Sequence, residues 1–238
     1  MDGTGTISFT NGNIYIGEFK DNMMNGNGTL NISSGSTISY KGNFLNSKMN
    51  GYGILLYRNG DIYSGNFDNN VISGVGELKF SSTGNIYQGD FSNGVMNGIG
   101  KMTFTTGDVL EGNFSDGKIT NGTMQFSDLG QYKGDFLNFK RNGKGTMKFP
   151  DGDFYDGYWV DGKMHGHGTY TYVSGDIYVG DYINDKKNGH GTYTYASGDK
   201  YIGMFSYNEK HGQGTYFYNG SDGRIVKGIF ESGEFSHL

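Results

Sequence analysis

Histidine is the residue type in this chain best suited to binding a metal ion, and five are present: His165, His167, His190, His211 and His237. Zinc holds imidazole nitrogens at about 2 Å in tetrahedral geometry. His167 and His190, however, occupy the same position in two copies of one segment, Gly-His-Gly-Thr-Tyr-Thr-Tyr. If the two copies are strands of consecutive hairpins, two strand spacings, about 10 Å, separate the rings. The sequence therefore predicts no metal site.

Glycine pairs and a row of aspartates are the other patterns that could perform chemistry. A G-x-G pair binds a dinucleotide only between a strand and a helix N-terminus, whereas every pair here lies inside an alternating strand pattern. Asp153, Asp176 and Asp199 each follow a loop glycine in consecutive copies, too far apart to share a proton. We interpret them as turn residues. With no G-x-S-x-G elbow present, the sequence predicts no catalytic residue, no cofactor and no enzyme activity.

Composition limits the class of protein. The 238 residues include 44 glycines, 19 tyrosines and 17 phenylalanines but one proline and no cysteine, which favours strands and a reducing, cytoplasmic compartment. No apolar run approaches the roughly 20 residues of a membrane helix, and the N-terminus shows no signal-peptide pattern. The net charge of −5 argues against nucleic-acid binding.

The chain is one tandem array. A Y-x-G-x-F pattern recurs every 22 to 25 residues, and the recurrences begin nine repeats, at Tyr15, Tyr40, Tyr63, Tyr87, Leu110, Tyr132, Tyr155, Tyr178 and Tyr201. A partial unit at residues 3–14 precedes them, and another at 226–238, starting at Val226, follows. We therefore expect a single domain over residues 1–238, with no linker.

Within a repeat, the alternation of residues predicts a β-hairpin. "YQGDF" (87–91) places Tyr, Gly and Phe on one face of a strand, and "GIGKMTF" (98–104) places Gly, Gly, Met and Phe on one face of the next. Glycines leave room for neighbouring rings to lie across bare backbone. The predicted fold is all-β, an elongated, twisted, single antiparallel sheet of about nine to ten hairpins. More than half of the residues should lie in strands, with no helix longer than two turns.

The segment "YQGDFSNGVMNGIGKMTFTTGDV" resembles the MORN repeat (membrane occupation and recognition nexus), and this resemblance covers essentially the whole chain. Local departures are Leu110 and Val226 for tyrosine, Trp159 and Tyr182 for phenylalanine, and a missing glycine in "KITNGTM". The resemblance implies a non-enzymatic protein–protein scaffold. It also implies, as alternatives, a structural subunit of a cytoskeletal or ciliary assembly and a phospholipid-associated protein.

Tyrosines concentrate in the C-terminal repeats, at repeat positions that hold Leu or Met in earlier repeats. A sealed core has no need of so many hydroxyls, and tyrosine is a frequent interface anchor. We predict that an aromatic groove here binds a helix or extended peptide of a protein partner; drift of the repeat within the core is the alternative. The predicted contact residues are Tyr155, Trp159, Tyr170, Tyr172, Tyr178, Tyr182, Tyr193, Tyr195, Tyr201, Tyr216 and Tyr218.

Basic residues gather in the turns inside the hairpins. They could make weak contacts with anionic lipid such as phosphoinositide headgroups, or contact an acidic partner. Nearby acidic residues dilute their charge, and a simple solvated edge is the alternative. The candidate lipid contacts are Lys140, Arg141, Lys163, Lys186, Lys187 and Lys210. A homodimer stays open as a further partner.

Overall fold

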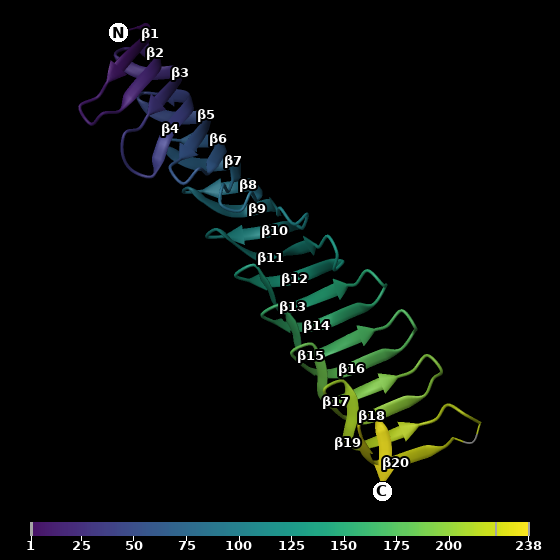
Figure 1. Cartoon of the computed structure of the whole chain (residues 1–238). Helices are drawn as coiled ribbons and strands as arrows, with labels where there is room; N and C mark the ends of the chain where they lie inside the picture. The colour runs from purple at the N-terminus through teal and green to yellow at the C-terminus, as the bar shows by residue number, and fades with distance from the viewer. Residues whose placement is uncertain (1, 222, 238) are drawn as a thin grey trace. The chain divides into compact units, whose positions relative to one another are not determined.

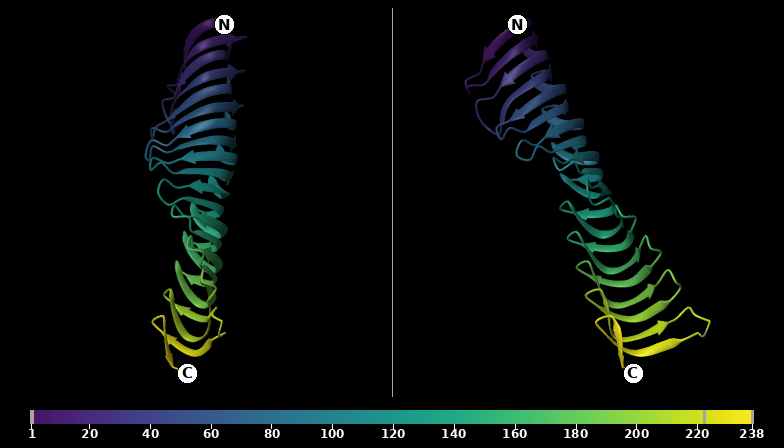
Figure 2. Two further views of the ribbon diagram at one scale, coloured as in Figure 1. Left: turned by 90° about the vertical axis from the view of Figure 1, so that its right-hand side faces the viewer. Right: turned by 45° about the vertical axis from the view of Figure 1, so that its right-hand side comes forward.

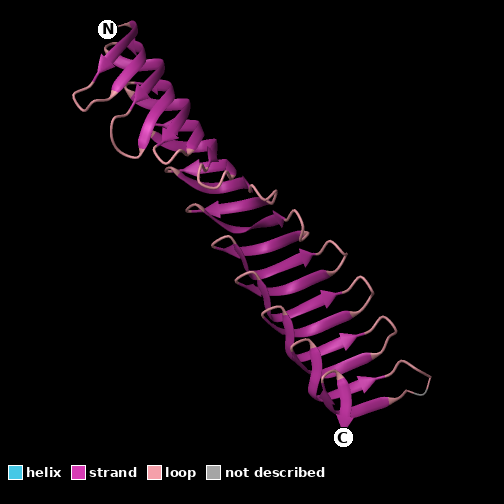
Figure 3. Ribbon diagram, viewed as in Figure 1, coloured by secondary structure: helices cyan, strands magenta, loops and turns pink. Residues whose placement is uncertain are grey.

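The computed structural model describes residues 2–221 and 223–237, and this part of the chain contains strands, turns and loops without any helix (Figure 3). Strands take up more than half of the 238 residues. No helix that could span a membrane occurs within these ranges. The prediction of an all-β fold is confirmed.

The chain divides into two units, Met1–Thr120 and Asn121–Leu238. The division falls within one strand, β11 (Lys118–Gln125). The first unit contains β1 (Gly3–Ser8), β2 (Ile14–Lys20), β3 (Met23–Asn31), β4 (Thr37–Leu45), β5 (Lys48–Tyr57), β6 (Ile62–Asp68), β7 (Val71–Lys79), β8 (Ile86–Ser92), β9 (Val95–Thr103) and β10 (Val109–Ser115). The second contains β12 (Gln131–Leu137), β13 (Lys140–Lys148), β14 (Phe154–Val160), β15 (Lys163–Thr171), β16 (Ile177–Ile183), β17 (Lys186–Thr194), β18 (Lys200–Ser206), β19 (Glu209–Phe217), β20 (Ile225–Glu231) and β21 (Glu234–His237).

Consecutive strands pair antiparallel from β1 to β10 in the first unit and from β11 to β21 in the second (Figures 1 and 2). The glycines set a common register: Gly157 of β14 faces Gly168 of β15, which on its other side faces Gly180 of β16. Between Gly157 and Trp159 the register shifts by a bulge. The same shift recurs in the repeats that begin at Tyr15, Tyr40, Tyr63, Tyr87, Tyr132, Tyr178 and Tyr201. The predicted tandem hairpins are therefore present in both units.

The core consists of rings lying across these glycines. A Cβ at Gly157 or Gly168 would overlap the Tyr155 ring, so both positions must lack a side chain. The Tyr155 hydroxyl donates to the Tyr158 carbonyl at 3.2 Å, which satisfies its polar end. The same arrangement recurs at the other fully buried tyrosines of the repeats, Tyr15, Tyr40, Tyr63, Tyr87, Tyr132, Tyr178 and Tyr201.

Edge-to-face contacts connect one repeat to the next. The Tyr40 ring lies 5.1 Å from Phe44 in its own repeat and 4.9 Å from Phe67 in the following one. In the second unit, Trp159 and Tyr182 take the phenylalanine position and keep this geometry against Tyr155, at 5.2 Å and 5.3 Å. Each such pair contributes roughly 0.5–1.5 kcal/mol beyond the area it buries.

Two-residue turns close the hairpins, and hydrogen bonds connect such turns to the preceding repeat. Asn184 and Asp185 have φ of 50° and 67°, the left-handed region that Asn, Asp and Gly tolerate best and that tight hairpins require. The amide of Asp185 donates to the Met164 carbonyl at 3.0 Å, and the Asp185 carboxylate accepts from the Met164 amide at 2.7 Å. The turn of one hairpin is thereby hydrogen-bonded to the first residues of β15 in the preceding repeat.

Candidate partner-binding face

Paired residues of an antiparallel sheet share a face, and the register therefore assigns each side chain to one side. We call the face of the second unit that carries Tyr155, Tyr178 and Tyr201 the ring face. Trp159 pairs with Met164, Tyr182 with Lys187, and Phe205 with Lys210, so these six residues also lie on the ring face.

Five of the eleven predicted contact residues are core residues. Tyr155, Tyr178 and Tyr201 are 0% exposed, Trp159 is 2% exposed and Tyr182 is 3% exposed. A partner cannot reach these side chains in this conformation because they lie across glycine backbone or under neighbouring rings. The prediction that these five residues contact a partner is therefore corrected: they form a buried layer beneath the exposed surface.

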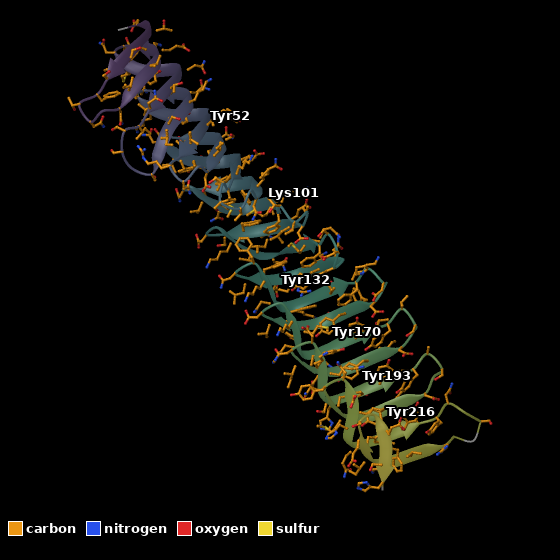
Figure 4. The ribbon with its side chains drawn as sticks, in the orientation of Figure 1. Tyr52, Lys101, Tyr132, Tyr170, Tyr193 and Tyr216 are labelled. Carbon is orange, nitrogen blue, oxygen red and sulfur yellow. The ribbon has the colours of Figure 1, made fainter. Side chains whose placement is uncertain are left out.

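The other six predicted residues form a continuous row of rings. Tyr170, Tyr172, Tyr193, Tyr195 and Tyr216 are half-buried, and Tyr218 is exposed. Successive ring centroids lie 4.5, 5.9, 4.6, 5.8 and 4.6 Å apart from Tyr170 to Tyr218. Figure 4 labels Tyr170, Tyr193 and Tyr216, which come from β15, β17 and β19. We call these six residues the tyrosine ladder.

Aspartates of the connecting loops fix alternate members of the ladder. The hydroxyls of Tyr170, Tyr193 and Tyr216 donate to Asp153, Asp176 and Asp199 at 2.8, 2.7 and 3.2 Å. The second oxygen of each carboxylate accepts a hydrogen bond from a backbone amide of the next loop, at Val173, Ala196 or Asn219. Burial, followed by the aspartate contact, raises the pKa of Tyr193 well above its usual range. These aspartates are turn residues, as predicted from the sequence, and in addition they hold the ladder in place.

Three of the six predicted basic residues lie on the ring face among aromatic rings. The Lys187 Nζ stands 4.8 Å from the Tyr193 centroid and donates to the Tyr172 hydroxyl at 3.2 Å. The Lys210 Nζ stands 5.0 Å from the Tyr216 centroid. The Arg141 guanidinium lies 4.4 Å above Trp159. Burial lowers the pKa of both Lys187 and Arg141.

The other three basic residues point away from the ring face. Lys140, Lys163 and Lys186 each precede a ring-face residue along their strands and are exposed, because successive side chains alternate between faces. Lys140 forms an exposed ion pair with Asp161 at 3.4 Å. The six residues predicted as one lipid-contact edge are therefore divided between two faces.

In the described part of the chain, the histidine side chains belong to no cluster of metal ligands. The Nδ1 atom of His167 lies 3.3 Å from a carboxylate oxygen of Asp181 on the exposed face. Among the described residues, no group of three or more His, Asp or Glu side chains could hold a metal ion.

The inward position of the cations was missed from the sequence because these residues were assigned to the hairpin turns. A signal was nevertheless present. The column that contains Arg141, Lys187 and Lys210 is apolar in the first unit, where it holds Met24, Met49, Ile72, Met96 and Ile119. An apolar column of this kind indicates a position facing the rings.

The fold and the ring face define a class: a repeat protein of tandem β-hairpins whose tyrosines lie across paired glycines. The MORN repeat family model matches residues 15–37, 40–62, 63–84, 87–109, 132–154, 155–177, 178–200 and 201–222. The chain belongs to the MORN repeat family. The match leaves out the repeat that starts at Leu110, where the division between the two units lies.

Comparison with other proteins adds little. No curated protein matches the sequence significantly. One similar solved structure is the TCP domain of SAS-4 (dCPAP) from Drosophila melanogaster in complex with a proline-rich motif of Ana2 (dSTIL). It is 13% identical, with a TM-score of 0.29 over 76% of this chain and 85% of that one. A streptogramin B lyase is 11% identical, with a TM-score of 0.18 over 96% of this chain and 83% of the other.

Proposed function

We propose that the chain is a non-enzymatic scaffold or adaptor that binds a helix or extended segment of a protein partner along the tyrosine ladder. MORN repeats occur in protein-interaction and membrane-associated proteins, and the chain contains eight matched repeats. The observation that carries the proposal is the row of six rings, half-buried to exposed, on one face of one unit.

The ladder has the properties of a preformed binding surface. Alternate rings are held by aspartates of the loops, so little side-chain entropy is left to lose on binding. Tyrosine contributes disproportionately to interface energies because it buries a large rigid ring and keeps a polar tip. Tyr195 contacts the rings of Tyr193 and Tyr216 at 4.6 and 5.8 Å, and it is the central ladder residue on which to test binding.

The test is affinity purification with the full chain as bait, followed by binding measurements with the partner recovered. Tyr195→Ala and Tyr193→Ala should each weaken binding by about 2 kcal/mol or more. Tyr158→Ala is the matched control, because Tyr158 lies in the same unit on the opposite face and is 53% exposed. Circular dichroism must show that each variant is folded.

Normal binding by both ladder variants, together with loss of binding in Met102→Ala or Phe104→Ala, would locate the site in the first unit and refute the proposal. The cytoplasmic location suggested by the composition, and the cytoskeletal or ciliary association suggested by the family resemblance, stay predictions.

Lipid binding is the second candidate function, and the three exposed lysines Lys140, Lys163 and Lys186 favour it. They recur at one-repeat intervals on one side of the second unit. We expect weak vesicle flotation that disappears as salt is added, because the net charge is −5 and exposed charges are screened. Salt-resistant, headgroup-selective flotation lost in Lys163→Glu and Lys186→Glu would instead make lipid binding the leading function.

A further inference from the structure

We propose that the partner segment recognised by the ring face is an α-helix with acidic side chains at positions i and i+7, which pair with Lys187 and Lys210. This inference rests on the proposed function and specifies the chemistry of its partner. The carrying observation is that lysines occupy two consecutive positions of one ring-facing column that is apolar in the first unit.

The register shows that these lysines occupy apolar positions. Lys187 pairs with Tyr182 and Lys210 with Phe205, just as Met24 pairs with Phe19 and Met49 with Phe44 in the first unit. A methionine there packs on the rings without any charge. A lysine has to bring an ammonium group into partly buried surroundings, which costs hydration free energy. Folding alone is served by methionine, so the two charges indicate a second purpose.

Among the described residues, neither lysine forms an ion pair with a carboxylate. Within residues 2–221 and 223–237, the ion pairs are Lys101–Glu111, Lys140–Asp161 and His167–Asp181, and none includes Lys187 or Lys210. Asp176 acts on Lys187 from a distance, but its two oxygens accept the Tyr193 hydroxyl and the Ala196 amide. Asp199 is committed in the same way to Tyr216 and Asn219.

The ammonium groups therefore retain unused donors. An ammonium group has three N–H bonds, and the Lys187 group gives one to the Tyr172 hydroxyl. Aromatic faces surround both groups, at 4.8 Å from the Tyr193 centroid and 5.0 Å from the Tyr216 centroid. These faces hold the charges in place and exclude part of the water. A carboxylate arriving from a partner would complete each site with a charge-assisted hydrogen bond.

The spacing of the two sites selects a helix. Lys187 and Lys210 are equivalent residues of consecutive repeats, so two strand spacings, about 9.6 Å, separate them. Seven residues of an α-helix rise about 10.5 Å and return to nearly the same face. Three residues of an extended strand cover a similar length but end on opposite faces. The Tyr193 ring lies 4.8 Å from the Lys187 Nζ, the Tyr195 ring lies 5.9 Å from the Lys210 Nζ, and the two ring centroids are 4.6 Å apart. Aromatic rings therefore connect the two sites, and the helix should present apolar side chains to them at i+3 and i+4.

The experiment is a selection on the immobilised full chain from a phage-displayed library of 20-residue helical peptides randomised on one face. We expect enrichment of Asp or Glu at positions seven residues apart, with apolar residues between them. A selected peptide and its Glu→Gln analogue are then synthesised, and their affinities are measured for the protein and its variants. We expect the Gln analogue to bind at least about tenfold more weakly.

The decisive variant is Lys187→Met combined with Lys210→Met, because it restores the residue type found in this column in the first unit. It should remain folded and lose at least about tenfold in affinity for the acidic peptide, while binding the Gln analogue nearly unchanged. The matched control, Lys163→Met with Lys186→Met, changes the net charge equally at exposed positions and should alter the affinity less than about threefold.

The remaining outcomes overturn the inference. Peptides that lose binding in Tyr195→Ala but show no acidic enrichment, or that bind the double methionine variant normally, refute it while leaving the proposed function intact. A selection that yields no peptide dependent on Tyr195 refutes the inference and also counts against the proposed function. Vesicles containing phosphatidylserine form the last arm: lysine-dependent flotation, without any acidic peptide selected, would assign the two cations to a membrane surface instead.

Discussion

Two paired glycines lie under each fully buried tyrosine, and we predict that alanine destabilises the fold at both positions but for different reasons. Gly180 of β16 and Gly191 of β17 face each other beneath Tyr178. The three atoms nearest to a Cβ at Gly191 would all belong to the Tyr178 side chain, at 2.5–2.7 Å. A Cβ at Gly180 would also lie 2.6 Å from the Gly191 Cα and 2.6 Å from the His190 carbonyl oxygen. The first clash involves a side chain that can be exchanged, whereas the second involves the neighbouring strand.

The magnitude for Gly191→Ala follows from what the displaced ring would lose. Tyr178 is 0% exposed, and burial of such a side chain is worth roughly 1.5–3 kcal/mol. Its edge-to-face contacts with Tyr182 and Phe205, at 5.3 and 5.0 Å, add about 1 kcal/mol each. The hydroxyl bond to the Asp181 carbonyl at 3.1 Å adds about 1 kcal/mol. Partial relaxation returns some of this, so we expect a loss of about 3–5 kcal/mol in the free energy of unfolding.

The assay is a double-mutant cycle with Tyr178→Leu, a change for which the chain supplies a precedent. Leu110 occupies the equivalent position of its own repeat and is 1% exposed. In the Tyr178→Leu background, Gly191→Ala should cost less than about 1 kcal/mol, because the atoms it would meet are gone. Gly180→Ala should still cost more than about 2 kcal/mol in that background, because the backbone contacts remain.

Denaturant unfolding followed by fluorescence of the single tryptophan, Trp159, reports on this region, because Tyr155 contacts both Trp159 and Tyr182. Equal costs for Gly191→Ala in the two backgrounds would refute the reasoning. So would a Gly180→Ala cost that disappears together with the tyrosine.

Two further predictions concern the ionisable groups. Burial raises the pKa of Tyr40, Tyr63 and Tyr87 from 10.0 to about 12, so the folded state keeps protons that the unfolded chain loses. Stability should be complete below about pH 10 and fall between about pH 10 and 12; tyrosinate absorbance that rises fully while circular dichroism stays native would contradict this. Asp176→Ala, which removes the acceptor of the Tyr193 hydroxyl and the Ala196 amide, should lower the free energy of unfolding by about 2–3 kcal/mol in denaturant titrations. Asp181→Ala, its control, should cost less than about 1 kcal/mol. Equal losses in the two variants would argue against a stabilising role for the Asp176 hydrogen bonds.

Local pattern was enough to predict the strands of each unit and the face of each strand on which the rings and glycines lie. Alternation with period two assigns Tyr155 and Gly157 to one face of a strand, and the repeat spacing implies that the next hairpin pairs beside it. The absence of a side chain at Gly168 indicates the space that the Tyr155 ring fills. These inferences succeed because strand periodicity and backbone sterics act over a few residues.

The tertiary structure decided which tyrosines are accessible and what the charged residues contact. Tyr178 and Tyr193 are the same residue type in facing strands, but the first is 0% exposed while the second is half-buried, because only the first lies across a glycine pair. Asp176 was recognisable as a turn residue, yet its bond to Tyr193 joins residues 17 positions apart. Lys187 differs from Lys186 only in the strand face on which it lies, and a bulge and a two-residue turn fix that face. Each outcome depends on register between strands, which sets distances that the sequence of a single strand does not contain.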